Sequence, residues 1–155
     1  MMSNRAQGFS FIELLAVLAV VGILSTIVWA SFSNFRQQQV LSGGTETVLS
    51  VLNQARSKTL AAKGSSRHGV RLASTTVTLF AGSSYAAGNV DNQTIALPAG
   101  VIIANVAVAG GGTDIVFDRL TGKTGQSGSI RLEIANNSAK SRTITVLSTG
   151  IIGTN

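Results

Sequence analysis

The sequence predicts an α+β fold, in which a long N-terminal helix packs on a mainly antiparallel β-sheet. An uncharged apolar run occupies residues 14–30, and an amphipathic helical pattern follows it to about residue 63. From residue 67 to residue 155 the pattern changes to short stretches of alternating apolar and polar residues, which is typical of strands. Because these strands follow one another with no helix between them, we expect mainly antiparallel pairing.

The helix is predicted to run from Ser10 to Lys63. Gly43 and Gly44 each weaken a helix by about 1 kcal/mol relative to Ala, so we expect a softened point there but no break. Residues 64–66, Gly-Ser-Ser, are expected to end the helix. Apolar or small residues recur at spacings of three, four and seven, which describes one helix face that would pack on the sheet: Leu41, Thr45, Val48, Leu52, Ala55, Thr59 and Ala62.

The strands are placed by their alternation and by the turn residues between them. Residues 82–93 are expected to form a loop, and residues 110–112 (three glycines) and 136–138 are expected to form turns. Strands are predicted around Val70–Leu72 and Val77–Leu79, and at residues 94–97, 101–108, 113–117, 130–134 and 142–148.

The composition excludes several classes of site. The chain has 155 residues and no cysteine, so disulfides and thiol chemistry are impossible. The net charge is +6, and charged residues make up only 12%. His68 is the only histidine and is expected on the surface, with no motif to complete a catalytic arrangement around it. Asp91, Asp114 and Asp118 are too few for a calcium site to be predicted. We therefore expect no enzyme activity, cofactor or metal.

The N-terminus is predicted to anchor the chain in a membrane. A helix from Phe9 to Ala30 would be about 33 Å long, close to the thickness of the hydrocarbon layer. Its ten Leu, Ile and Val residues after Glu13 contribute roughly −3 to −6 kcal/mol to insertion, which offsets about +3 kcal/mol for one acid. Arg5 in the short polar leader predicts a cytoplasmic N-terminus and an external C-terminal part. An acid in such a segment is a functional candidate.

The residues Gly8-Phe9-Ser10-Phe11-Ile12-Glu13-Leu14, followed at once by the apolar run, resemble the type IV prepilin signal. The resemblance implies a type IV pilin-like fold and cleavage by a prepilin peptidase between Gly8 and Phe9. It also implies N-methylation of Phe9 and assembly with other pilins or pseudopilins through Phe9 and Glu13. The new amine of Phe9 could pair with Glu13 of a neighbouring subunit, since opposite charges attract strongly at low dielectric.

This resemblance divides the chain into a leader at 1–8, an assembly helix at 9–31 and an extracytoplasmic domain at 32–155, with a helix at 32–63 and a sheet at 67–155. It places the protein in the inner membrane as a single-pass chain with its C-terminal domain in the periplasm. Ser10 and Phe11 replace the commoner Thr and Leu of the signal, and Ala30 stands where many members carry Pro.

Three later stretches are similar to the GspH/FimT group of minor pseudopilins. They are Gln54-Ala55-Arg56-Ser57, then Phe117 to Thr124, and finally Arg142 to Val146 followed by Thr149-Gly150. The implied function is that of a minor pseudopilin or minor pilin, which initiates or caps a type II secretion pseudopilus or a type IV pilus.

Two alternatives stay open from the sequence. The first is a minor pilin that binds DNA during natural uptake, because phosphate contacts need only a basic surface. The second is an uncleaved, signal-anchored monomer with a different extracytoplasmic role. After residue 118 the only acidic residue is Glu133. The candidate DNA-binding residues are the cations of this part of the sequence: Arg119, Lys123, Arg131, Lys140 and Arg142.

Overall fold

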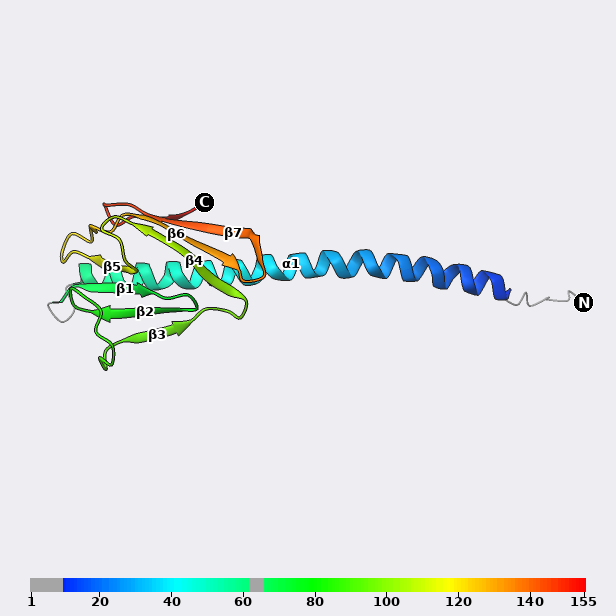
Figure 1. Cartoon of the computed structure of the whole chain (residues 1–155), viewed down its shortest axis with the longest axis horizontal. Coiled ribbons are helices and arrows are strands. Elements are labelled where there is room, and N and C mark those ends of the chain that lie inside the picture. The colour runs from blue at the N-terminus through cyan, green and yellow to red at the C-terminus, as the bar shows by residue number, and fades with distance from the viewer. Residues whose placement is uncertain (1–9, 62–65) are drawn as a thin grey trace, which may run out of the picture. The chain divides into compact units, whose positions relative to one another are not determined.

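The protein combines one long helix with short strands, as Figure 1 shows for the computed structural model. The structure describes residues 10–61 and 66–155. Helix α1 (Phe11–Leu60) comes first, and all the strands follow it. The strands are β1 (His68–Leu72), β2 (Thr76–Ala81), β3 (Gln93–Ala96), β4 (Val101–Val108), β5 (Asp114–Phe117), β6 (Gly128–Ile134), β7 (Asn137–Val146) and β8 (Ile152–Thr154).

The predicted α+β class is confirmed, and α1 runs through Gly43 and Gly44 without a break. It ends at Leu60, earlier than predicted; Lys63 and most of the Gly-Ser-Ser stop signal lie outside the described residues. The chain divides into two compact units, Met1–Arg36 and Gln37–Asn155. The second unit contains the later part of α1 and all the described strands.

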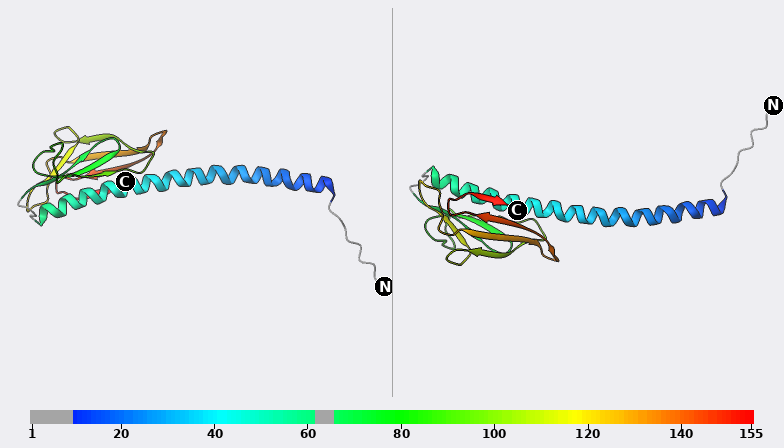
Figure 2. Two further views of the ribbon diagram at one scale, coloured as in Figure 1. Left: turned by 90° about the horizontal axis from the view of Figure 1, so that it is seen from below. Right: turned by 90° about the horizontal axis from the view of Figure 1, so that it is seen from above.

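The strands form two antiparallel sheets instead of the single sheet expected from the sequence. One sheet has the order β3-β2-β1-β5, and the other has the order β4-β6-β7-β8. Every neighbouring pair is antiparallel, as predicted. In the Gln37–Asn155 unit, both sheets lie on the same side of the helical segment (Figure 2). Alternation marks each strand but not its partners, which explains why the division into two sheets was missed.

The core lies between the later part of α1 and the two sheets. The predicted helix stripe is confirmed for Leu41, Thr45, Val48, Leu52, Ala55 and Thr59, which are all buried. Ala62, its last predicted member, lies outside the described residues. The hydroxyl groups of Thr45 and Thr59 donate to the carbonyl oxygens of Leu41 and Ala55 at 2.8 Å, so neither buried polar group is left unpaired. The sheets contribute most of the other core residues, which include Val70, Leu72, Val77, Leu79, Val101, Ile103, Ile115, Phe117, Ile130, Leu132, Ile144 and Val146.

Two strand boundaries differ from the prediction near the C-terminus. β7 begins at Asn137, inside the segment 136–138 that was expected to be a turn, and a register shift follows where it pairs with β6. The short β8 was not predicted and pairs with β7 from Val146↔Ile152 to Ile144↔Thr154. A strand of three residues, one of them Gly153, has too little alternation to be recognised, and its ladder with β7 holds it in place.

Candidate functional site

The predicted assembly residues lie at the start of α1. Gly8 and Phe9 lie outside the described residues, so the cleavage and methylation site stays a prediction. Glu13 lies in the first turn of the helix, and its side chain is exposed. The carbonyl oxygen of Ser10 accepts hydrogen bonds from the backbone N–H groups of Glu13 at 3.0 Å and Leu14 at 3.2 Å. Ser10 therefore lies at the N-cap position of α1, two residues after Gly8.

The surface around Glu13 is apolar. Between Ser10 and Arg36 the sequence contains no charged residue except Glu13. Large apolar side chains are exposed along this part of α1 at positions that cover all faces of a helix, and a helix that is apolar all round requires burial against another apolar surface. The exposed residues are Phe11, Ile12, Leu14, Leu15, Val17, Leu18, Val20, Val21, Ile23, Leu24, Val28, Trp29, Phe32 and Phe35.

Two polar residues of this segment, Ser25 and Thr26, form hydrogen bonds within the helix. The Ser25 hydroxyl donates to the carbonyl oxygen of Val21, and the Thr26 hydroxyl donates to that of Ile23, both at 2.7 Å. Neither hydroxyl group therefore needs water or a partner chain. Ser25 also lines an apolar hollow on one stripe of α1 together with Val21, Leu24, Val28, Trp29 and Phe32.

Within residues 10–61 and 66–155, no helix is long and apolar enough to cross a bilayer.

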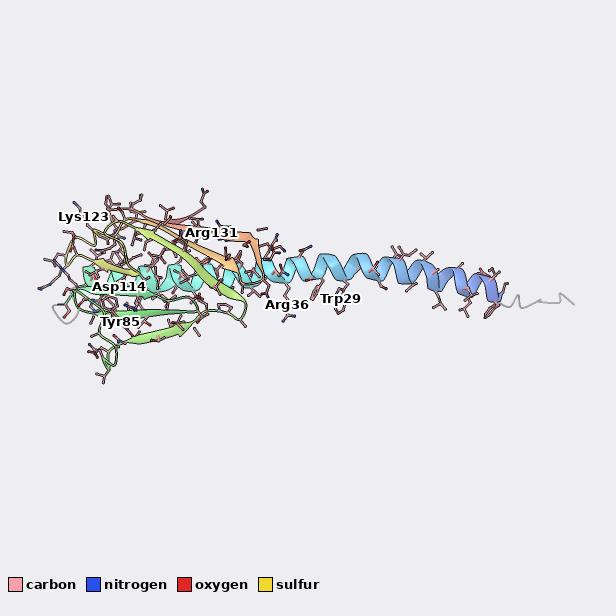
Figure 3. All side chains as sticks on the ribbon, viewed as in Figure 1. Trp29, Arg36, Tyr85, Asp114, Lys123 and Arg131 are labelled. Carbon is pink, nitrogen blue, oxygen red and sulfur yellow. The ribbon has the colours of Figure 1, made fainter. Side chains whose placement is uncertain are left out.

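The five predicted DNA-binding residues do not form one cluster. Arg119 and Lys123 lie in the loop between β5 and β6. Arg131 lies on β6, where its Nε is 3.7 Å from Glu133 Oε2 and its Nη2 donates to the carbonyl oxygen of Ser138 at 3.2 Å. Figure 3 shows Lys123 and Arg131 toward different ends of the Gln37–Asn155 unit.

The other two predicted cations are brought together on β7. Lys140 and Arg142 line a hollow of about 430 Å³ with Gln38 and Leu41 of α1, and with Ala139, Ser141 and Asn155. Lys140 is half-buried and Arg142 is exposed. The structure thus separates the predicted basic surface into the β5–β6 loop, the Arg131–Glu133 pair and this hollow.

His68 is buried, which corrects the expectation of a surface histidine. Its backbone N–H donates to the Thr59 hydroxyl at 3.1 Å, which joins the start of β1 to the last turns of α1. Its Nδ1 is buried without a hydrogen-bond partner among the described residues. Burial lowers the pKa of the imidazole, nearby Lys58 lowers it further, and a backbone hydrogen bond with Ser66 opposes both effects.

Two of the three aspartates, Asp114 and Asp118, form ion pairs. Arg71 donates to Asp114 at 3.3 Å, and its guanidinium lies 4.6 Å from the centre of the Tyr85 ring. Arg67 pairs with Asp118 at 3.4 Å. Within residues 10–61 and 66–155, no group of three or more His, Asp or Glu side chains could hold a metal ion.

Three segments that are far apart in the sequence meet at the C-terminal end of α1, and sequence reasoning missed this junction. Arg56 Nε donates to the carbonyl oxygen of Gly122 at 3.4 Å. Gly122 and Gly150, with φ of 62° and 78°, lie so close together that a Cβ on Gly150 would overlap the Gly122 carbonyl. The Thr124 backbone N–H donates to the carbonyl oxygen of Ser148 at 3.1 Å, which links the same two loops.

Comparison with known proteins identifies the N-terminal segment. Residues 3–29 match the family model described as the prokaryotic N-terminal methylation motif, which is the prepilin-type signature. No curated protein and no solved structure was found to match the chain. The signature is that of pilin and pseudopilin subunits, which are processed by a prepilin peptidase and assemble with other pilins from a membrane-anchored state. Such proteins are structural subunits and not typically enzymes. The α+β fold is consistent with the type IV pilin-like fold.

Proposed function

We propose that this protein is a minor pseudopilin or minor pilin, a subunit that initiates or caps a type II secretion pseudopilus or a type IV pilus. One observation carries the proposal. Glu13 is an exposed acid on an apolar helix, inside the methylation motif and without another charged residue before Arg36. An isolated carboxylate in such a segment is stable in an apolar environment only if a positive charge reaches it.

Cleavage between Gly8 and Phe9 would supply that charge. The new ammonium group of Phe9, which the same peptidase then methylates, would lie at the end of an apolar helix and would itself need a partner. In a stack of parallel helices, Glu13 of one subunit meets the Phe9 amine of the next. Leaving either charge alone costs about 3–5 kcal/mol, so the pair sets the register between subunits.

The same segment is proposed to anchor the chain in the inner membrane before assembly. Residues 9–31 would cross the bilayer once, with the N-terminus in the cytoplasm and the β-sheets in the periplasm. The support comes from the uncharged run at 14–30 and from the internal hydrogen bonds of Ser25 and Thr26, which remove the cost of placing hydroxyl groups in lipid.

Assignment to the GspH/FimT group of minor pseudopilins is supported by the junction at the end of α1. The sequence stretches that resemble this group include Arg56, Gly122 and Gly150, which meet there. Residues that are scattered in the sequence but pack together in the fold suggest one shared structural unit rather than three chance similarities.

The intact mass of the protein tests the processing step. After coexpression with a prepilin peptidase, we expect the protein to lose residues 1–8 and to gain one methyl group on Phe9. Expression without the peptidase is the matched control and should give the full chain. Retention of the leader in the presence of an active peptidase would favour the uncleaved, signal-anchored monomer.

Replacement of Glu13 tests the assembly step. In cells with the complete machinery, Glu13→Ala should strongly reduce incorporation into sheared filaments, because the buried amine of the neighbouring subunit loses its partner. Glu46→Ala is the matched control, since Glu46 is an exposed acid on the same helix but lies beyond the apolar segment. Equal incorporation of the Glu13 and Glu46 variants would contradict the proposed pairing.

DNA capture is less well supported than the structural role. Glu133 partly neutralises Arg131, and Lys123 lies toward another end of the unit, so a single continuous phosphate-binding surface is not favoured. Stacking on bases also requires aromatic side chains, and the sequence has none after Phe117.

A further inference from the structure

The β6–β7 hairpin lies at the end of the Gln37–Asn155 unit where the chain enters from the N-terminal segment. Asn137 Nδ2, in this hairpin, donates to Gln37 Oε1 at 3.3 Å. Lys140 and Arg142 line the hollow that also includes Gln38 and Leu41. The first residues of the unit are thus flanked by the two cations of β7.

The neighbouring loops at this end carry no acidic residue. The backbone N–H of Ala135 donates to the carbonyl oxygen of Gly100 at 2.9 Å, and that of Ile103 donates to Ser74 at 2.8 Å, so the loops at 73–75 and 97–100 lie at the same end. Their sequences, Ala-Ser-Thr and Leu-Pro-Ala-Gly, are uncharged. Glu133 is already paired with Arg131. Lys140 and Arg142 are therefore two cations at an end whose neighbouring loops add no acidic side chain.

The covalent chain keeps this end close to the proposed anchor. Gln37 follows Ala30, the last residue of the apolar run, by only seven positions. These positions belong to α1, and seven helical residues at about 1.5 Å each advance about 10 Å, a length comparable to that of the headgroup layer. The headgroup layer adds roughly 5–8 Å to each side of the hydrocarbon core, so cations on this end lie within reach of lipid phosphates.

We propose that Lys140 and Arg142 form a binding surface for the phosphate groups of anionic phospholipids in the outer leaflet of the same membrane. This inference rests on the proposed membrane anchoring. Basic residues beside an anchor are attracted to anionic headgroups, and the attraction is screened by salt. The contact would hold the sheets against the bilayer before the subunit is extracted into a filament.

The absence of native cysteine allows a clean fluorescence experiment on the full chain. An environment-sensitive dye is attached at Asn136→Cys, an exposed position in the hairpin, or at Thr121→Cys, an exposed position in the β5–β6 loop. The protein is reconstituted into vesicles of phosphatidylcholine, with or without about one third phosphatidylglycerol. A nitroxide on the lipid headgroup quenches dyes that lie at the membrane surface.

We expect quenching at Asn136→Cys to rise at least about twofold when phosphatidylglycerol is present, and to return to the phosphatidylcholine level in high salt. Lys140→Gln with Arg142→Gln should abolish this rise. Arg119→Gln with Lys123→Gln removes the same net charge from the β5–β6 loop and should leave the rise intact. The dye at Thr121→Cys should show no rise. Circular dichroism of each variant verifies that the fold is kept.

Vesicle flotation separates the two proposals. If the protein floats with the vesicles but quenching at Asn136→Cys is the same in both lipid compositions, the proposal of a lipid-binding surface is wrong, whereas the proposed anchoring is supported. If the protein does not float, the anchoring and this inference both fail. If Lys140→Gln with Arg142→Gln abolishes salt-dependent binding of duplex DNA but leaves lipid quenching unchanged, the two cations serve DNA capture instead.

Discussion

His68 carries an uncompensated polar atom inside the Gln37–Asn155 unit. Its Nδ1 is buried without a partner among the described residues, and Lys58 is the nearby charge that opposes protonation of the ring. The ring also lines a hollow with Lys58, Asp91 and Gln93. The neutral imidazole is therefore the form that the fold accommodates.

Stability should fall in mild acid because of this histidine. The pKa of His68 in the folded protein lies below the usual 6.5, so the unfolded chain binds the proton more readily. The free energy of unfolding is unaffected well above pH 6.5, and it decreases as the pH falls from about 6.5 to the folded-state pKa. Denaturant unfolding of the full chain in detergent, between pH 8 and pH 5, measures this. His68→Gln should have a flatter pH profile, and identical profiles for the two proteins would contradict the assignment.

Position 150 requires glycine, because the carbonyl oxygen of Gly122 occupies the space that a Cβ at this position would fill. Alanine at position 150 would adopt an unfavourable φ, which costs about 1–2 kcal/mol, and would overlap the Gly122 carbonyl, which costs about 1–3 kcal/mol more. Gly110→Ala is the matched control, since Gly110 has a φ of 83° but open space around it. In thermal unfolding, Gly150→Ala should lower the midpoint temperature clearly more than Gly110→Ala does. Similar losses would mean that the contact with Gly122 is unimportant.

At the scale of elements, α1 contains two adjacent glycines in different surroundings. A Cβ on Gly43 would meet no atom within 4 Å, whereas a Cβ on Gly44 would lie 2.9 Å from Val101 Cγ1. The helix backbone at Gly44 therefore packs closely against the Val101 side chain of β4. The sequence identified both glycines as weak points of the helix, but only the packing distinguishes them.

The two glycine substitutions should have different effects on stability. Gly43→Ala should raise the free energy of unfolding by about 1 kcal/mol, because alanine favours the helix and nothing opposes its methyl group. Gly44→Ala should raise the free energy of unfolding by the same amount through helix propensity, but crowding against Val101 should lower it by about 1–3 kcal/mol. Denaturant unfolding of the two single variants provides the comparison. If both substitutions stabilise equally, the close approach of α1 to β4 is wrong.

At the scale of the whole molecule, the single tryptophan reports on the proposed anchor. Trp29 is 81% exposed and lies next to Ala30, the last residue of the apolar run; Figure 3 shows its side chain on α1. Tryptophan favours the interface between lipid and water, so an anchored chain would place it near the headgroups.

Transfer of the full chain into vesicles should therefore shift the emission of Trp29 to shorter wavelength. Nitroxide near the headgroup should quench it more than nitroxide deep in the acyl chains. A variant with Trp29→Phe and Tyr85→Trp moves the reporter to the β-sheet unit and should not respond. Emission from Trp29 that is unchanged by vesicles would contradict the anchoring.

The sequence by itself determined the features that depend on local pattern. The helix around Val48 and Leu52, the alternating strand around Ile130 and Leu132, and the isolated acid Glu13 follow from the spacing of neighbouring residues, because each pattern is complete within a few turns or residues. The prepilin-type signature at residues 3–29 is local in the same way.

Only the tertiary structure decided which distant segments meet. It divided the strands into two sheets, added β8, buried His68, joined Arg56 to Gly122, and set Lys140 and Arg142 beside the first residues of their unit. Each of these results depends on backbone pairing or close packing between residues far apart in the chain, and periodicity within one segment carries no information about its partners.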